Sequence, residues 1–313
     1  MKKRIFFILI IKLIFTNNIY SAFKDGNTIS ARVSGLGGAF TAIADDTASQ
    51  MYNTAGLSSI LNKSVLITYS KMFLGLDQVD ISYLYFAASM PIVNIGTIGV
   101  GFNNFSTSDL YNENTFIVSY AVNINKFIKI SGPEIYTGIN FKYFYNSFTM
   151  DERSLIDPVF STQTSSGNMG IDSGILIKKF INFLPELNAG IFIKNLNYPD
   201  IGIYSRDLIP AEYRFGLAYL FPYLTKTGDS LKTDIDFIYR NNIFNFAFGL
   251  EFSFLKDMLL LRTGINSDEF DFGAGTSYKI NSTMKINFNY TFTYTFNISG
   301  DLGSHKISIY FYF

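Results

Sequence analysis

Residues 285–296 read KINFNYTFTYTF, a stretch in which large apolar and polar side chains alternate without interruption. Successive side chains of a β-strand point to opposite faces of the sheet. One face of this strand would carry Ile286 and five aromatic rings, and the other a lysine, asparagines and threonines. Such alternation predicts a long strand between an apolar medium and a polar one.

The same pattern recurs along the chain from residue 64 onward. Fourteen segments of 7 to 13 residues show it: 64–70, 79–88, 97–103, 115–123, 135–147, 170–178, 187–195, 212–221, 230–240, 245–254, 259–266, 270–279, 285–296 and 305–313. A membrane-spanning strand needs about 9–11 residues, and single-chain bacterial barrels have an even number of strands. The sequence therefore predicts an all-β fold, a 14-stranded antiparallel transmembrane β-barrel over residues 63–313.

A soluble β-sandwich is the alternative fold. Its strands average about 5–6 residues, whereas many segments here reach ten, and the 33 Phe and 21 Tyr are typical of the aromatic girdles of outer-membrane barrels. The barrel is therefore favoured. With both termini on the periplasmic side, the long connections 148–169, 196–211 and 104–114 would face outward.

The composition excludes several classes of protein. Only 16% of the 313 residues are charged, against roughly 25% in an average soluble domain. The 25 basic and 25 acidic residues cancel, which gives no electrostatic basis for binding nucleic acid. The chain has no cysteine and one histidine, His305, so few side chains are present that could form a metal site or a catalytic triad. We expect no enzyme activity, cofactor, metal or nucleic-acid partner.

The start of the chain predicts export. Residues 2–4 are basic, residues 5–15 are apolar apart from Lys12, and Ser21 and Ala22 are small residues suited to cleavage. The apolar stretch is too short for a membrane anchor. We expect a signal peptide over residues 1–22 and a location in the outer membrane of a Gram-negative-type (diderm) bacterium.

The end of the chain points to the same membrane. Phe313 follows apolar residues at every second position, which resembles the signal read by the outer-membrane barrel-assembly machinery. The alternative is a last strand that simply stops there. The expected partners are outer-membrane lipid and this machinery.

Glycines recur on the predicted inward face, where a strand glycine often marks close approach by another backbone. They are Gly99, Gly101, Gly138, Gly174, Gly190, Gly216, Gly249, Gly264, Gly273 and Gly275. Residues 23–62 do not read as membrane strand and are the predicted plug (hatch) inside the barrel. Ala-rich residues 40–48 predict a short helix. Asp45 and Asp46 are placed to cap a helix over residues 47–52, and a carboxylate pair for metal or acid–base chemistry is the alternative.

Residues 30–46 read SARVSGLGGAFTAIADD and residues 52–57 read YNTAGL. These stretches resemble the N-terminal hatch of the FadL/PorV superfamily of outer-membrane β-barrels. The resemblance implies a fourteen-stranded barrel with an N-terminal plug. It assigns these residues to the hatch motif: Gly37, Gly38, Asp45, Asp46, Asn53, Ala55 and Gly56. Thr54 stands where the family has proline, which puts the rigid turn there in question. Further stretches resemble the PorV/PorQ branch: 157–160, 195–202, 249–251, 262–266 and 273–275.

Charged and apolar side chains also fall on the inward face. A turn centred on residues 256–257 would place Glu251 opposite Arg262, either as a pair that anchors the plug or as a site for a ligand carboxylate. A second inward group is expected to form a hydrated network: Arg214, Lys232, Asp234, Asp236 and Arg240. The candidate lumen ligand-binding residues are Phe144, Leu176, Phe192, Leu220, Ile238, Arg262 and Glu251. The apolar members would either pack the plug or line a pocket for an acyl chain.

These patterns leave two functions open. The first is passive uptake of hydrophobic small molecules such as long-chain fatty acids, as the resemblance to FadL implies. The second is a non-transporting barrel that binds or anchors secreted proteins at the cell surface, as PorV does in type IX secretion. The outer loops 148–169 and 196–211 would then carry the partner surface.

Overall fold

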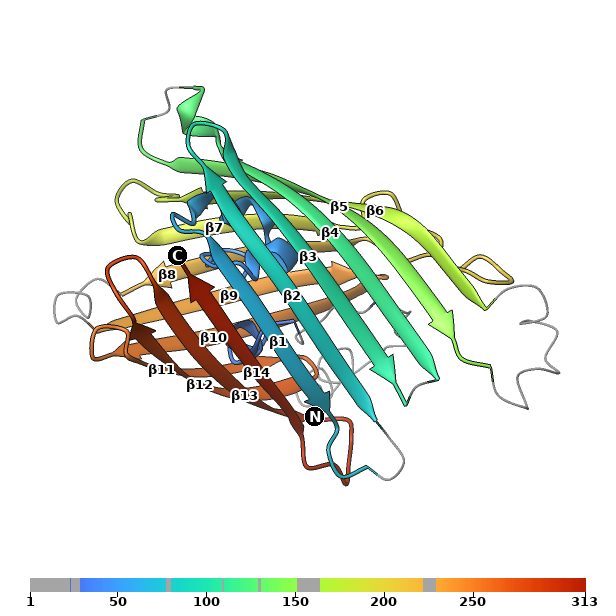
Figure 1. Ribbon diagram of the computed structural model, residues 1–313. Helices are drawn as coiled ribbons and strands as arrows, with labels where there is room; N and C mark the ends of the chain where they lie inside the picture. Colours follow the sequence, from blue (N-terminus) through green and yellow to red (C-terminus); the bar gives the residue numbers. More distant parts are fainter. Residues whose placement is uncertain are drawn as a thin grey trace, which may run out of the picture.

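The computed structural model describes residues 23, 29–76, 80–108, 110–128, 131–150, 164–221 and 229–313. The predicted signal peptide and the motif at 157–160 lie outside these residues. Within the described part, fourteen strands form a closed antiparallel barrel in which β1 pairs with β14 (Figure 1). The barrel and its strand number, both predicted from the sequence, are confirmed.

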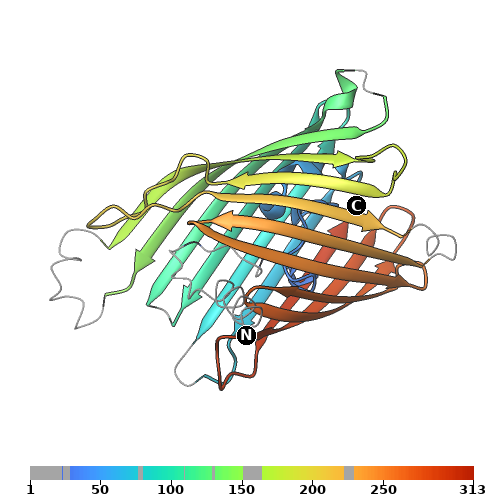
Figure 2. The same cartoon turned by 180° about the vertical axis from the view of Figure 1, so that it is seen from behind.

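The strands are β1 (Ser64–Met72), β2 (Ile81–Ile92), β3 (Gly96–Thr107), β4 (Tyr111–Asn123), β5 (Glu134–Phe148), β6 (Ser165–Lys178), β7 (Leu187–Lys194), β8 (Glu212–Leu220), β9 (Ser230–Arg240), β10 (Ile243–Phe254), β11 (Leu259–Asn266), β12 (Glu269–Lys279), β13 (Lys285–Thr295) and β14 (Ser304–Tyr312). A short helix, η2 (Ile124–Lys126), follows β4. Seen from behind, the strands continue around the wall without a break (Figure 2).

Each strand has a buried inner face and an exposed outer face. In β13, Asn289 and Thr291 are buried, whereas Phe288 and Tyr290 on the other face are 46% and 41% exposed. Exposed aliphatic and aromatic side chains cover the outside of the barrel in the same way on the other strands, as expected of a wall in lipid. Among the described residues, no helix is long and apolar enough to cross a membrane.

Four strands extend by four residues or more beyond the predicted segments, among them β2, which ends at Ile92 instead of residue 88. β3 and β4 continue until only residues 108–110 connect them, so the predicted loop 104–114 is wrong, and β6 begins at Ser165 instead of residue 170. Polar side chains are frequent in the extensions of β3, β4 and β6, as where Nδ2 of Asn104 donates to Oδ1 of Asn114 at 3.0 Å. Hydrophobic alternation marks only the part of a strand that lies in lipid, and therefore does not reveal them.

Residues 29–60, here called the inserted segment, lie inside the barrel and lead into β1 (Figure 1). The segment contains α2 (Ala31–Ser34), α3 (Ser49–Tyr52) and η1 (Thr54–Ser59). α2 contacts β12, β13 and β14, and η1 contacts β3, β4, β5 and β6. The segment therefore touches strands from both halves of the chain.

The helix predicted over residues 40–48 is wrong, because these residues form turns and irregular backbone. The N–H groups of Phe40 and Thr41 donate to the carboxylate of Asp236 in the wall. Ala44 has a left-handed φ of 32°, which a regular right-handed helix does not contain. Contacts with the wall thus override the helical propensity of the alanines.

Candidate functional site

Nine of the ten inward glycines are places where the inserted segment approaches the wall, and the tenth, Gly275, faces Asn289 and Arg262 of the wall itself. A Cβ added at Gly249 or Gly264 would overlap the backbone of residues 36–37, and one added at Gly190 would overlap the carbonyl group of Thr41. Interior positions of a close-packed protein cannot absorb such overlaps without strain. A side chain at these positions would push the segment away from the strands.

The hatch-motif residues stabilise the turns of the inserted segment. Gly37 and Gly38 have φ values of +67° and +84°, a region that favours glycine. Asn53 caps η1 by accepting a hydrogen bond from the N–H of Ala55 at 3.3 Å, and its Nδ2 donates to the carbonyl of Thr41 at 2.8 Å. The motif therefore connects two turns that are distant in sequence.

Gly56 of the motif and the neighbouring Thr54 shape the next turn. A Cβ at Gly56 would overlap the carbonyl oxygen of Ala44. Thr54 begins η1, and its hydroxyl donates to the carbonyl of Gln50 at 3.3 Å. The family that the hatch motif resembles has proline at this position. The turn therefore forms with threonine at this position.

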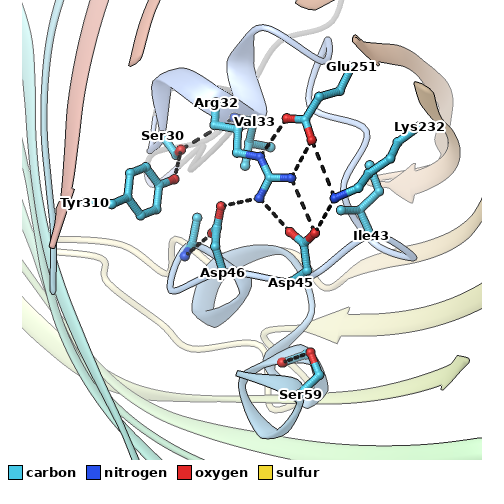
Figure 3. A network of polar contacts seen from close by, with 12 residues as sticks. Ser30, Arg32, Val33, Ile43, Asp45, Asp46, Ser59, Lys232, Glu251 and Tyr310 are labelled. Carbon is cyan, nitrogen blue, oxygen red and sulfur yellow. Dashed lines mark hydrogen bonds and ion pairs between the residues drawn. The ribbon is translucent and has the colours of Figure 1, made fainter. Parts of the chain in front are cut away.

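Arg32 of α2 is the centre of a buried ionic network (Figure 3). Its guanidinium donates to both carboxylate oxygens of Glu251 at 2.8 Å, to Asp45 at 2.6 Å and to Asp46 at 2.7 Å. The Arg32 side chain is 12% exposed. Such charge-assisted and bidentate hydrogen bonds are the strongest class in proteins. One side chain thus joins α2, the Asp45–Asp46 turn and β10.

The wall neutralises the rest of this network. Glu251 faces Arg262 across the β10–β11 ladder, as predicted, and the Nε of Arg262 donates to Glu251 at 2.6 Å. Lys232 of β9 donates to Asp45 at 2.7 Å and lies 3.7 Å from Glu251. The network therefore contains three cationic and three anionic side chains. Because Glu251 binds Arg32 and Arg262 together, the contacts agree with the anchoring alternative for this pair.

Asp45 and Asp46 differ in their electrostatic surroundings. Burial alone would raise the pKa of Asp45, but the attraction of Arg32 and Lys232 is stronger and lowers it. Burial outweighs the attraction of Arg32 at Asp46, and repulsion from Asp45 adds to the effect, so the pKa of Asp46 is raised. Asp46 also accepts a hydrogen bond from the N–H of Ala48 at 2.8 Å. Asp46 therefore stabilises the turn before α3, but the N-cap of α3 is Ala48 and no side chain caps it, so the predicted capping of a helix over residues 47–52 is wrong. Both Asp45 and Asp46 serve as ion-pair partners of Arg32.

The second inward group differs from the hydrated network that we expected. Asp236 is fully buried and accepts hydrogen bonds from Phe40 and from the hydroxyl of Thr41 at 2.6 Å. Arg214 donates to the carbonyl of Gly38 at 3.0 Å. Unpaired N–H groups of the irregular backbone need acceptors when they are buried, and the wall supplies these. Four members, Arg214, Lys232, Asp234 and Asp236, therefore bind the inserted segment, whereas Arg240 pairs with Glu212 of β8.

An apolar cluster lies on the inner face of β5. Phe144 packs edge-to-face on Phe23 with ring centroids 4.9 Å apart, and both contact Ile201 and Ile209 of the connection between β7 and β8. All four side chains are at most 2% exposed. We call these four residues the Phe144 cluster.

The other apolar candidates lie in different surroundings. Leu176 is buried against Ala44 and Ala55 of the inserted segment. Phe192 is fully buried beside Gly174. Leu220 and Ile238 also face inward but are only half-buried. The structure therefore divides the candidate lumen residues between several places, and their role in ligand binding stays a prediction.

Sequence reasoning missed two residues that contribute to these contacts. Arg32 belongs to the motif that resembles the hatch, but it had no assigned role because none of its partners is close in sequence. The buried side chain of Gln50 donates to the hydroxyl of Ser119 at 2.8 Å and accepts from the hydroxyl of Tyr85 at 2.9 Å. Buried polar groups are almost always hydrogen-bonded. Polar residues in a segment that leads into a barrel are therefore the sequence feature from which such contacts could be predicted.

No protein-family model and no curated protein matches this chain. Among solved structures, the CymD monoaromatic hydrocarbon channel covers 91% of the chain and 96% of its own length, with a TM-score of 0.60 and 9% identity. The toluene transporter TbuX of Ralstonia pickettii covers 91% and 98%, with a TM-score of 0.58 and 10% identity. A Pseudomonas aeruginosa FadL homologue covers 91% and 97%, with a TM-score of 0.54 and 10% identity. The chain has the fold of these channels.

Proposed function

We propose that the chain is a passive outer-membrane channel for hydrophobic small molecules such as long-chain fatty acids. The observation that carries the proposal is a closed fourteen-stranded barrel whose interior holds the inserted segment. A barrel filled in this way differs from a porin, whose lumen is an aqueous channel. The fold shared with hydrocarbon channels and a FadL homologue supports a hydrophobic ligand.

In this proposal the ligand first meets the Phe144 cluster. In the cluster, apolar contacts join the barrel wall to the connection between β7 and β8, beside a hydrogen bond from Asn146 to the carbonyl of Ile201. A hydrophobic ligand leaving water can replace such contacts, since burial of its own apolar surface is favourable. The inserted segment then acts as the hatch, and the ligand passes when the hatch moves.

The test is binding of a fluorescent long-chain fatty acid to the purified, folded barrel, with unlabelled fatty acid and toluene as competitors. Phe144→Asp and Phe192→Asp each place a charge at an apolar candidate position. Asn103→Asp is the matched control, because Asn103 is a buried polar residue on the inner face of β3. We expect saturable binding that weakens by about tenfold or more in the two Phe variants only.

Vesicle uptake of the same compound then separates binding from transport. No saturable binding by the folded wild-type barrel would overturn the proposal. If all three substitutions weakened binding equally, the ligand would not bind at the apolar candidate residues.

A second candidate function is a surface for secreted proteins, as the resemblance to the PorV/PorQ branch suggests. The connection between β7 and β8 carries two exposed aromatic residues, Tyr198 and Tyr204, which are 47% and 78% exposed. Exposed aromatic side chains are enriched at protein interfaces. Capture of a secreted protein that is lost in a Tyr198→Ser, Tyr204→Ser variant, by a barrel that binds no fatty acid, would favour this function.

A further inference from the structure

Two lysines lie opposite each other on the inner face of the barrel wall. Lys279 ends β12, Lys285 begins β13, and the two residues are directly paired in the β12–β13 ladder. Lys285 shares its face with the buried Asn289 and Thr291. Lys279 shares its face with Gly273, which lies against the inserted segment. Both side chains therefore belong to the lumen, at the end of the barrel where β14 ends and β1 begins, which is the periplasmic end in the predicted orientation.

The surroundings of these two lysines are cationic. Opposed like charges on neighbouring strands repel each other, and Lys285 is also repelled by Arg32 and Lys232 of the ionic network. The network holds equal numbers of cationic and anionic side chains and has no spare carboxylate for the pair. Asp257 attracts Lys285, but its carboxylate accepts a hydrogen bond from Ser253. In the part of the chain that the structure describes, neither lysine forms an ion pair, so an anion between them would relieve the repulsion.

An aromatic ring lies beside the lysines. Tyr312 of β14 is the ladder partner of Lys285, and the Lys285 ammonium lies 5.7 Å from the centre of its ring. Tyr312 is half-buried and packs against the core that includes the inserted segment. On the same face of β13, the buried amide oxygen of Asn287 has no hydrogen-bond partner among the described residues, although such groups are almost always paired. Cationic, polar and aromatic groups thus meet at one place, as an amphipathic anion requires.

We propose that Lys279 and Lys285 bind the carboxylate of the transported ligand as it leaves the barrel, with the hydrocarbon chain beside Tyr312. This inference rests on the proposed function, and it narrows the ligand from hydrophobic small molecules in general to carboxylates. The two oxygens of a carboxylate can each accept a charge-assisted hydrogen bond, so one group can bridge two opposed ammonium groups. A neutral hydrocarbon gains nothing from this site. Arg262, the position that the sequence offered for a ligand carboxylate, is already bound to Glu251.

A tryptophan reporter tests this site directly, because the chain contains no tryptophan of its own. Tyr312→Trp places the reporter beside Lys285. Tyr120→Trp is the matched control, since Tyr120 is 39% exposed on the outer face of β4. The folded full-length barrel is titrated at pH 7 with α-bromododecanoate, whose bromine quenches a nearby tryptophan, and with its methyl ester, which has no charge.

We expect the Tyr312→Trp reporter to bind the acid about tenfold more tightly than the ester. Lys279→Gln with Lys285→Gln should abolish this preference. Lys126→Gln with Lys179→Gln, which replaces exposed lysines of two other turns at the same end, should keep it. Should Tyr312→Trp not fold, calorimetric titration of the wild type and of the lysine variants with dodecanoate and its methyl ester gives the same comparison.

The outcomes separate this site from the proposed transport. Equal affinity for acid and ester at Tyr312→Trp, the same preference at Tyr120→Trp, or equal loss with the control lysines overturns the carboxylate site, whereas fatty-acid uptake into vesicles would still support the transport. A preference for the acid at Tyr312→Trp, in a barrel that takes up no fatty acid, would support the carboxylate site and overturn the transport.

Discussion

Replacement of Arg32 by methionine tests how the inserted segment is held. The substitution keeps a long side chain but removes the hydrogen bonds to Glu251, Asp45 and Asp46. The remaining network has three carboxylates and two cations, Lys232 and Arg262, and therefore carries one uncompensated buried charge. Removing one partner from a buried ion pair costs about 3–5 kcal/mol.

We expect this loss to appear as local opening of the inserted segment. The strand ladders do not involve Arg32, so the barrel should stay closed. Amide hydrogen exchange of residues 30–48, followed by mass spectrometry, should become roughly 10²- to 4 × 10³-fold faster. Exchange in the strands should change little.

Two variants control this experiment. Arg206 is 75% exposed and pairs with Asp200 at the surface, so Arg206→Met should leave the exchange unchanged. Adding Asp46→Asn to Arg32→Met restores equal numbers of charges, so the double variant should be less destabilised than the sum of the single effects. Unchanged exchange in Arg32→Met, or strict additivity in the double variant, would refute the proposed role of the network.

Three other changes test neighbouring contacts. Asp45→Asn should lower the free energy of unfolding at pH 7, and this difference from the wild type should shrink as pH falls below about 4, because the pKa of Asp45 is lowered in the folded state. Asp46→Asn should lower the free energy of unfolding at pH 7 by less. The raised pKa of Asp46 means that the folded state takes up its proton before the unfolded state does, so acidification stabilises the fold through this group. Urea unfolding at pH 7, 5 and 3 measures the stability of both variants. Equal destabilisation of the two variants at pH 7 would contradict the different roles given to Asp45 and Asp46. Gly264→Val should destabilise by about 1–3 kcal/mol in the same assay, whereas the lipid-facing Ala274→Val should not. Asp236→Leu should speed exchange at residues 40–43 because it leaves buried N–H groups unpaired; unaltered exchange would show that other acceptors suffice.

The sequence predicts the barrel well because lipid imposes a strict periodicity on its wall. The bounds of β9 and β11 agree with the predicted segments 230–240 and 259–266, and the opposition of Glu251 and Arg262 follows from one turn. The polar extensions of β3, β4 and β6 were missed because they lie beyond the alternating part of each strand. The inserted segment was harder to predict, since Arg32 and Asp236 form long-range contacts that no local pattern encodes.

The order of elements along the chain has a consequence for assembly. The inserted segment is synthesised before any strand, yet α2 packs against β12, β13 and β14 while η1 packs against β3 to β6. The hydroxyls of Ser30 and Tyr310, 280 residues apart, lie 2.6 Å from each other. A chain that ended before β12 would keep the contacts of η1 and lose those of α2. The segment can therefore act as an internal template, on which the first and last strands are brought together only when the whole wall is present.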